Sequence, residues 1–533
     1  MRLAWPMFVL AACGGEERDV DAVDSSLAPD TVEAEVGDGD AAEVEAVDAA
    51  DGEAPPATLE ERGHVAVRTI VHLHSAYSHD GCDDHGLDAE GRPDMDCVRR
   101  MKRALCGEGI GVAFMTDHPG HMRDQAFSDL LYGEPGDEVV TSDEGPRAIR
   151  YPCPDGGGGP DGRVTLYVGY EATHTMGIGL ERHLEPRDHY GTSFEDTTPD
   201  DDLRAATEAV RAAGGLVTIA HSEEDGLSAA TIARHDVAAM ELYNFHANFK
   251  VVLGTDLGDK LFALEDFVAA EAEVPDPDLT ALVMFDRYPE RALTKWREVS
   301  AVRSITAFAG SDVHENVSLP AFCDADGLCD GLAQDYPNLV ARLTTGGPVW
   351  QSDDERLDGY ARIFGWVQNR VLVPATAAEG DLGAAVRTAF EAGRNVVVFE
   401  VLGDATGVAL MTRDASGAIV DMGGAVAPTP GLTLWARSPD LPLPGRRAAW
   451  TDGSAAAIES VLWKSTADGT SEVLRWSEPG AWRSLPLEAG AGASYHLEVW
   501  IVPHHLVDAL GPAEALAHAP YRWVETNAIR VSP

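Results

Sequence analysis

The feature that most constrains the fold is an alternation of short apolar strands with helical segments, which starts at His64 and runs for roughly 250 residues. Apolar residues at helical spacing occupy 95–105 and 201–213, and glycine follows each segment. Apolar and β-branched runs predict strands at residues 65–73, 112–115, 164–169, 216–220, 240–243 and 305–309. Strands joined through helices pair in parallel, because a parallel connection needs a long crossover. The pattern predicts an α/β fold, either a parallel barrel or an open doubly wound sheet.

Residue types that bind metals follow five of these strands. They are His72 with His74, Asp117 with His118, Glu171 with His174, His221 alone, and Asp312 with His314. Side chains two residues apart on a strand share a face, so alternation would point His72 and His74 the same way. The carboxyl ends of parallel strands meet on one face, so we expect these groups to converge. Nitrogen and oxygen donors without thiolates favour Zn, Mn or Fe.

Taken in order, these motifs resemble those of the polymerase and histidinol phosphatase (PHP) family of metal-dependent hydrolases. The matching motifs are His72-x-His74, Thr116-Asp117-His118, Gly169-x-Glu171, the lone His221 and Gly310-Ser311-Asp312-x-His314. The match covers residues 65–314. The resemblance implies a distorted (β/α)7 barrel that binds two or three divalent metal ions.

Carried over by position, the resemblance assigns ligands to each ion. One ion would be held by His72, His74, Glu171 and Asp312, with Glu171 bridging to the next ion. The other positions would be completed by His118, His174, His221 and His314. Asp80 takes the place that the family gives to an Asp or His after the first pair. One inserted residue leaves His79 as an alternative to Asp80, and His183 is an alternative to His174.

The expected chemistry is hydrolysis by an activated water, because divalent ions lower the pKa of bound water to about 7. Glu171 would bridge the ions, and the leaving group would take a proton from His118, Asp117 or His314. Low-ranking candidates for substrate contact are Lys250, His246 and Arg123.

Three functions fit this site. The first is a phosphoesterase that acts on a small phosphate ester. The second is a carboxylic ester or amide hydrolase of the carbaryl type, which uses the same metals. The third is a non-catalytic surface binding protein, which the complete ligand set disfavours.

The first residues resemble the signal of a bacterial lipoprotein. Arg2 and a short apolar stretch precede Leu10-Ala11-Ala12-Cys13, which looks like a lipobox with Cys13 as the lipidated residue. The resemblance implies export and a lipid anchor in the cell envelope. Residues 14–63 hold 17 acidic residues, two arginines and no aromatic residue, a composition typical of a disordered tether.

Exported proteins form disulfides, and six cysteines remain after Cys13. Cys323 and Cys329 flank a short polar loop, so we expect them to pair. The other four cysteines allow three connectivities, which the sequence does not resolve: Cys82, Cys97, Cys106 and Cys153.

Later segments change character. Residues 119–160 are rich in Gly, Pro and Asp and predict a long insertion loop. Beyond Gly393 short strands and turns predominate, which predicts a β-sandwich like that of exported, carbaryl-hydrolase-like PHP proteins. The expected division is a signal (1–13), a tether (14–63), a barrel (64–350), a connecting segment (351–394) and a sandwich (395–533).

The net charge excludes one class of partner. The chain of 533 residues carries 89 Asp and Glu against 40 Lys and Arg, a formal charge of −49. Such a surface repels phosphate backbones, so we expect a small-molecule substrate and no nucleic acid. Membrane contact is expected through the lipid anchor alone, and the sequence sets no oligomeric state.

Overall fold

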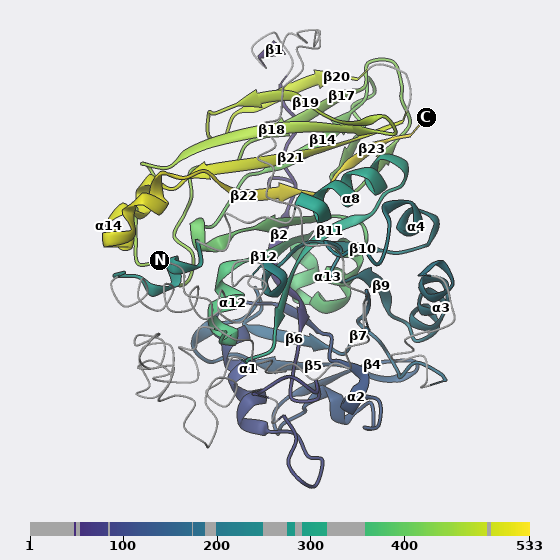
Figure 1. The fold of residues 1–533 in the computed structure, drawn as a ribbon. Coiled ribbons are helices and arrows are strands. Elements are labelled where there is room, and N and C mark those ends of the chain that lie inside the picture. The colour runs from purple at the N-terminus through teal and green to yellow at the C-terminus, as the bar shows by residue number, and fades with distance from the viewer. Residues whose placement is uncertain are drawn as a thin grey trace, which may run out of the picture.

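The computed structural model describes residues 47–48, 54–83, 86–172, 174–186, 199–248, 274–282, 290–316, 358–487 and 492–532. The fold is mixed α/β, with one large sheet and a second, smaller sheet (Figure 1). Helices and parallel strands make up the half that contains β2 and β10. The yellow-green strands β17 to β21 form layers at the other end (Figure 1).

Six parallel strands form the centre of the large sheet, and all six coincide with predicted strands. In spatial order they are β9 (Leu216–Ile219), β10 (Ala239–Asn244), β11 (Thr306–Val313), β2 (His64–Leu73), β3 (Val112–Met115) and β6 (Arg163–Tyr167). Two antiparallel strands extend the sheet beyond β9: β8 (Thr175–Ile178) and β7 (Tyr170–Ala172). A hydrogen bond of 2.8 Å from Leu180 N to Val168 O joins this edge to the chain that leaves β6.

Helices connect the parallel strands, as the alternation predicts. They are α1 (Met95–Gly107), α3 (Pro199–Ala212), α4 (Ala229–Arg234) and α8 (Glu290–Val302). α1 begins where the Asp94 carboxylate accepts hydrogen bonds from the backbone of Asp96 and Cys97. Its apolar face, which includes Val98 and Met101, is buried in the main core.

The prediction of a long loop at residues 119–160 is wrong in part. It contains the short helix α2 (Pro119–Met122) and a hairpin of β4 (Glu138–Ser142) and β5 (Gly145–Pro152). β5 pairs antiparallel with β6 and therefore widens the large sheet. The hairpin gave no alternating apolar pattern in the sequence, because β4 is largely exposed and the adjacent residues Ala148 and Ile149 are both buried on β5.

The large sheet divides at β2. The second half of β2 pairs with β11, whereas its first half pairs antiparallel with β12 (Gln368–Pro374). From β12 the sheet continues through β13 (Asn395–Val398), β22 (Tyr521–Thr526), β21 (Ala493–Val502), β18 (Ala457–Thr466) and β19 (Gly469–Trp476). One sheet therefore runs from the parallel strands into the C-terminal half.

This continuity corrects the expected division of the chain. The segment 351–394 was predicted as a connection with one helix near residues 382–392. α13 (Leu382–Glu391) is that helix, but the segment also supplies α12 (Tyr360–Trp366) and the sheet strand β12. β13 was predicted to open the sandwich, yet it pairs with β12 and β22 and so belongs to both halves.

The smaller sheet covers the C-terminal part of the large one. Its order is β1 (Val47–Asp48), β20 (Trp482–Pro486), β17 (Thr433–Arg437), β14 (Ala409–Arg413) and β15 (Ile419–Asp421). Leu410 and Leu434 of this sheet share a buried core with Leu462 and Leu497 of the larger one. Two antiparallel layers around one core agree with the predicted sandwich.

Residues 54–63 are folded, although their composition placed them in the tether. Leu59 is 4% exposed and lies in the main core. Arg413 donates a hydrogen bond of 2.9 Å to Ala54 O, and Ala375 N donates one of 2.9 Å to Gly63 O. The folded part therefore starts by residue 54 rather than at residue 64.

Two disulfides join Cys82 to Cys97 and Cys106 to Cys153, which selects one of the three connectivities. Both involve α1. Cys13, Cys323 and Cys329 lie outside the described residues. Within the described part of the chain, no helix has the length and apolar character needed to span a bilayer.

Candidate metal centre

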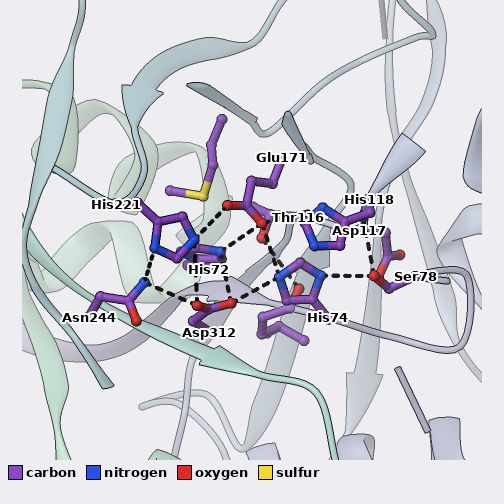
Figure 2. Close-up of polar contacts among 12 residues, drawn as sticks. His72, His74, Ser78, Thr116, Asp117, His118, Glu171, His221, Asn244 and Asp312 are labelled. Atoms are coloured by element: carbon purple, nitrogen blue, oxygen red, sulfur yellow. Dashed lines mark hydrogen bonds and ion pairs between the residues drawn. The ribbon is translucent and has the colours of Figure 1, made fainter. Parts of the chain in front are cut away.

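Four predicted ligands meet in a buried group at the carboxyl ends of the parallel strands. His72 and His74 are 0% exposed, Glu171 is 1% and Asp312 is 3%. Their side chains point toward one another in Figure 2. The ligand atoms of the four lie within 4.8 Å of one another, so a single ion can reach all of them. We call these four residues the inner group.

Distances inside the inner group show two histidines facing two carboxylates. His72 Nε2 lies 3.1 Å from Glu171 Oε2 and 3.2 Å from Asp312 Oδ1. His74 Nε2 lies 3.3 Å and 3.2 Å from the same two oxygens. This is the set that the PHP resemblance assigns to one ion.

The inner group fits a divalent metal because three of its buried atoms that could bind an ion form no hydrogen bond. His72 Nε2, His74 Nε2 and Glu171 Oε2 are all in this condition. Buried polar atoms are normally paired, and an unpaired one costs about 1–3 kcal/mol. A bound cation would satisfy all three atoms, and imidazole with carboxylate suits Zn, Mn or Fe.

A second, more open group lies beside the first and is called here the outer group: His74, Asp80, His118 and His314. Asp80 Oδ2 lies 3.2 Å from His314 Nε2 and 3.5 Å from His118 Nε2. The Asp80 and His118 side chains are 27% and 26% exposed. The geometry favours Asp80 over His79, whose half-exposed side chain is absent from this group.

Glu171 lies between the ligand sets. Its Oε2 is shared by the inner histidines, while its Oε1 lies 3.0 Å from His221 Nε2. His118 Nδ1 lies 3.6 Å from Oε2. Glu171 therefore contacts four histidines from three chain segments, the position expected of a bridging carboxylate.

Positive φ angles and shifts in strand register orient several of the candidate ligand residues. His72, His221 and Asp312 have positive φ angles of 62°, 45° and 50°. The pairing of β2 shifts register between Val71 and Leu73, and the pairing of β11 shifts across Asp312. His72 and His74 thus converge through a bulge rather than by simple alternation, which corrects the expected cause. Such conformations cost about 1–3 kcal/mol each and cluster at functional sites.

Besides His79, four residues predicted as metal ligands, as their alternatives or as proton donors lie outside both groups: Asp117, His174, His183 and His221. Of these, His221 groups instead with Glu223 and Glu241. His174 faces Glu224, with 3.7 Å between Nδ1 and Oε2. Its alternative, His183, has its Nε2 at 3.0 Å from the backbone oxygen of Gln125. Asp117 accepts hydrogen bonds from Ser75 N and Oγ at 2.5 and 2.6 Å, so it braces the loop after β2.

The candidates for substrate contact differ in position. The His246 ring lies 5.3 Å from that of His314, at the edge of the outer group. The Arg123 side chain is 48% exposed and lies 4.0 Å from Asp124. Lys250 lies outside the described residues.

Glu241 was not predicted to take part in the site. It is fully buried on β10, and its Oε1 lies 2.6 Å from His72 Nδ1. Its Oε2 accepts a hydrogen bond of 2.6 Å from His221 N. The available signal was a charged residue inside the apolar run Met240–Tyr243, because buried carboxylates are rare unless they are paired.

Attraction between the buried histidines and carboxylates of the site shifts their pKa values. Burial opposes the charge of His221, yet hydrogen bonds to Glu171 and Glu223 and nearby carboxylates raise its pKa to about 11. Burial also opposes ionisation of Glu171, but the charge of His72 and the hydrogen bond from His221 hold its pKa well below the usual range. In the metal-free chain, protons therefore balance the carboxylates, and metal binding would release them.

A further cluster in the C-terminal half contains His496, Glu498 and Glu525. Arg297 donates to His496 Nε2 at 3.3 Å and to Glu498 at 2.7 Å. Arg522 Nε lies 3.0 Å from Glu498 Oε1. Two guanidinium groups already supply positive charge here, so this cluster is an ion-pair network rather than a second metal site.

Comparisons with known protein families, with curated proteins and with solved structures found no match to this chain.

Proposed function

We propose that this chain is a PHP-type metal-dependent hydrolase, a phosphoesterase that acts on a small phosphate ester. The observation that carries the proposal is the inner group, whose unpaired buried donors face one another beside a half-open outer group. The order of the motifs and the parallel strands support a distorted barrel of the PHP type.

Different residues of the chain would hold the two ions. The inner group would hold one divalent ion, and Asp80, His118 and His314 would hold a more exposed one. When bound, such ions supply Lewis-acid activation of water and stabilise negative charge. His118 is 26% exposed and contacts both Asp80 and Glu171, so the ion that it would help to hold would lie where a small substrate can enter.

The substrate class follows from charge. The chain has a net charge of −49, so an extended polyanion such as nucleic acid is repelled. A small phosphate ester would instead be attracted by the positive charge of the ions over a short range. We therefore propose a small-molecule substrate and no nucleic-acid partner.

Export and lipidation at Cys13 are part of the proposal. Two disulfides support an oxidising compartment, because cytosolic proteins rarely keep them. Mass analysis of the mature protein from bacterial membranes tests this, with a diacylglycerol-modified Cys13 as the expected first residue. A mature protein that retains residues 1–12 contradicts it.

The activity is tested on the purified protein by elemental analysis and by turnover of phosphomonoesters, phosphodiesters and aryl esters with Mn or Zn. We expect hydrolysis of a phosphate ester, and its loss together with bound metal in the double variant His72→Ala/His74→Ala. His518→Ala, in the exposed His504–His518 pair, is the matched control and should retain both.

Other outcomes decide between the alternatives. Turnover of aryl esters alone would favour the carboxylic ester or amide hydrolase. A metal-loaded protein without any turnover would favour a binding protein. Full activity in the double variant would refute the assignment of the site.

A further inference from the structure

Glu241 contacts the metal centre, although the proposed reaction assigns it no role. Its two oxygens lie 2.6 Å from His72 Nδ1 and 2.6 Å from the backbone nitrogen of His221. Asn244 Nδ2 lies 3.2 Å from Glu241 Oε2 and 3.2 Å from Asp312 Oδ2. One carboxylate is therefore linked to three ligand residues from three strand ends.

The neighbouring strand leaves room for this carboxylate. Glu241 is 0% exposed, and a Cβ atom at Gly310 would lie 1.8 Å from its Oε1. Gly310 directly precedes Ser311 and Asp312 on β11. Any larger residue at position 310 would displace the Glu241 side chain or the strand that carries Asp312.

The contact with His72 determines which ring nitrogen can bind a metal. A carboxylate at Nδ1 accepts a hydrogen bond from the Nδ1–H group, which keeps the proton on Nδ1 and leaves the lone pair on Nε2. Nε2 is the atom that faces Glu171 and Asp312, and it has no hydrogen-bond partner. The same carboxylate holds the backbone of His221, whose φ of 45° needs support from its surroundings.

Glu241 also falls within a possible ligand group with His221 and Glu223. Its hydrogen bonds argue against direct ligation. Each oxygen already accepts a donor at 2.6 Å, and Asn244 approaches both oxygens. Both carboxylate oxygens therefore already interact with donors of the protein, and neither is left to bind an ion.

We propose that Glu241 is a positioning residue that holds His72 in its metal-binding tautomer and fixes the backbone of His221. The inference rests on the proposed metal site but not on the identity of the reaction. Its role is to raise the affinity of the inner group for a divalent ion.

The test is the variant Glu241→Gln, measured by competition for Zn with a chromophoric chelator. The Gln amide replaces one acceptor oxygen by an NH2 group that only donates, so it cannot accept on both sides, from His72 Nδ1 and from the backbone nitrogen of His221. Loss of such a partner weakens metal binding by about 10–100-fold, and we expect a change of that size. Turnover should recover at high metal concentration, with an unchanged KM for substrate.

Two further variants keep the test specific. Glu400→Gln removes another buried carboxylate, which pairs with Arg68 at 2.8 Å, and it should lower the thermal midpoint without changing Zn affinity. Gly310→Ala should weaken Zn binding as Glu241→Gln does, because it crowds Oε1.

The outcomes separate this inference from the proposed function. Wild-type Zn affinity in Glu241→Gln overturns it, as does an equal loss of affinity in Glu400→Gln. Zn affinity is measured in both variants without substrate. A protein that binds Zn but hydrolyses nothing would therefore still test the role of Glu241.

Discussion

At the residue scale, the site depends most on Glu171, because the inner and outer sets both approach this carboxylate. Glu171→Gln should lose the inner ion and weaken the outer one, since His72, His74 and His118 all lie within 3.6 Å of its Oε2. Elemental analysis after dialysis measures this as metal per chain.

Asp80→Asn is the matched comparison for Glu171→Gln. Asp80 contacts His118 and His314 and belongs to the outer group only. This variant should lose the outer ion and keep the inner one. Equal metal content in the two variants would contradict a central role for Glu171.

At the element scale, the Cys82–Cys97 disulfide ties the Asp80 loop to α1. Cys82 follows Asp80 by two residues, and its backbone nitrogen donates to His314 O at 2.9 Å. The bridge closes a loop of 15 residues, which stabilises the fold by about 3 kcal/mol. Cys82→Ser/Cys97→Ser should lower the free energy of unfolding by about that amount and weaken the outer ion selectively, as measured by denaturation and metal titration.

The second disulfide is the control for this prediction. Cys106–Cys153 spans 47 residues at the other end of α1. Its removal should destabilise the fold by about 4 kcal/mol and leave affinity for the outer ion intact. If both disulfide variants weaken the outer ion equally, the Asp80 loop is not held by its own bridge.

The C-terminal end of α1 makes stability depend on pH. Burial raises the pKa of Glu108 to about 7 despite the neighbouring Arg447. The folded state therefore keeps a proton that the unfolded state releases near 4.5, so the free energy of unfolding falls as pH rises from 4.5 to 7. In Glu108→Gln the free energy of unfolding should not fall over this pH range. The variant should therefore be more stable than the wild type by about 3 kcal/mol above pH 7, and this difference should vanish near pH 4.5.

Thermal melts across this pH range measure the effect. Arg447 keeps its ion pair with Asp278, at 2.5 Å, in the variant. A stability difference that is the same at every pH would show that Glu108 is not the group that titrates.

At the scale of the whole molecule, three buried asparagines join the two halves. Their side-chain amides form hydrogen bonds with backbone N–H and C=O groups of β11, along the edge where the sheet divides. Asn369 pairs with both backbone groups of Ala309 at 3.0 and 2.8 Å. Asn527 accepts from Ala307 N at 2.6 Å, and Asn395 donates to Ala307 O at 2.8 Å.

Each asparagine replaces a missing strand partner, so Asn395→Ala should lower the free energy of unfolding by about 1–3 kcal/mol. A chain that ends at residue 394 lacks Asn395, Asn527 and strand β13, and it should fail to fold. Denaturant unfolding and size-exclusion chromatography test the two statements. A monomeric, folded 1–394 fragment would contradict the joined arrangement.

The sequence by itself determined the parallel strands, the terminal sandwich and most of the residues that meet in the inner and outer groups. These depend on local patterns: apolar runs of strand length, and histidines or carboxylates directly after them. Histidines and carboxylates from five segments were expected to converge because the strand ends of an α/β sheet share one face. The grouping of His72, His74, Glu171 and Asp312 came from the resemblance to the PHP motifs.

Only the tertiary structure decided the rest, because it depends on contacts between distant segments. It selected Asp80 over His79, and it showed Glu241 behind His72 across 169 residues of chain. It also showed that β12 and β13 join the halves, since strand pairing is set by register and neighbours rather than by composition. Local pattern specifies which residues are available, and long-range packing decides which of them meet.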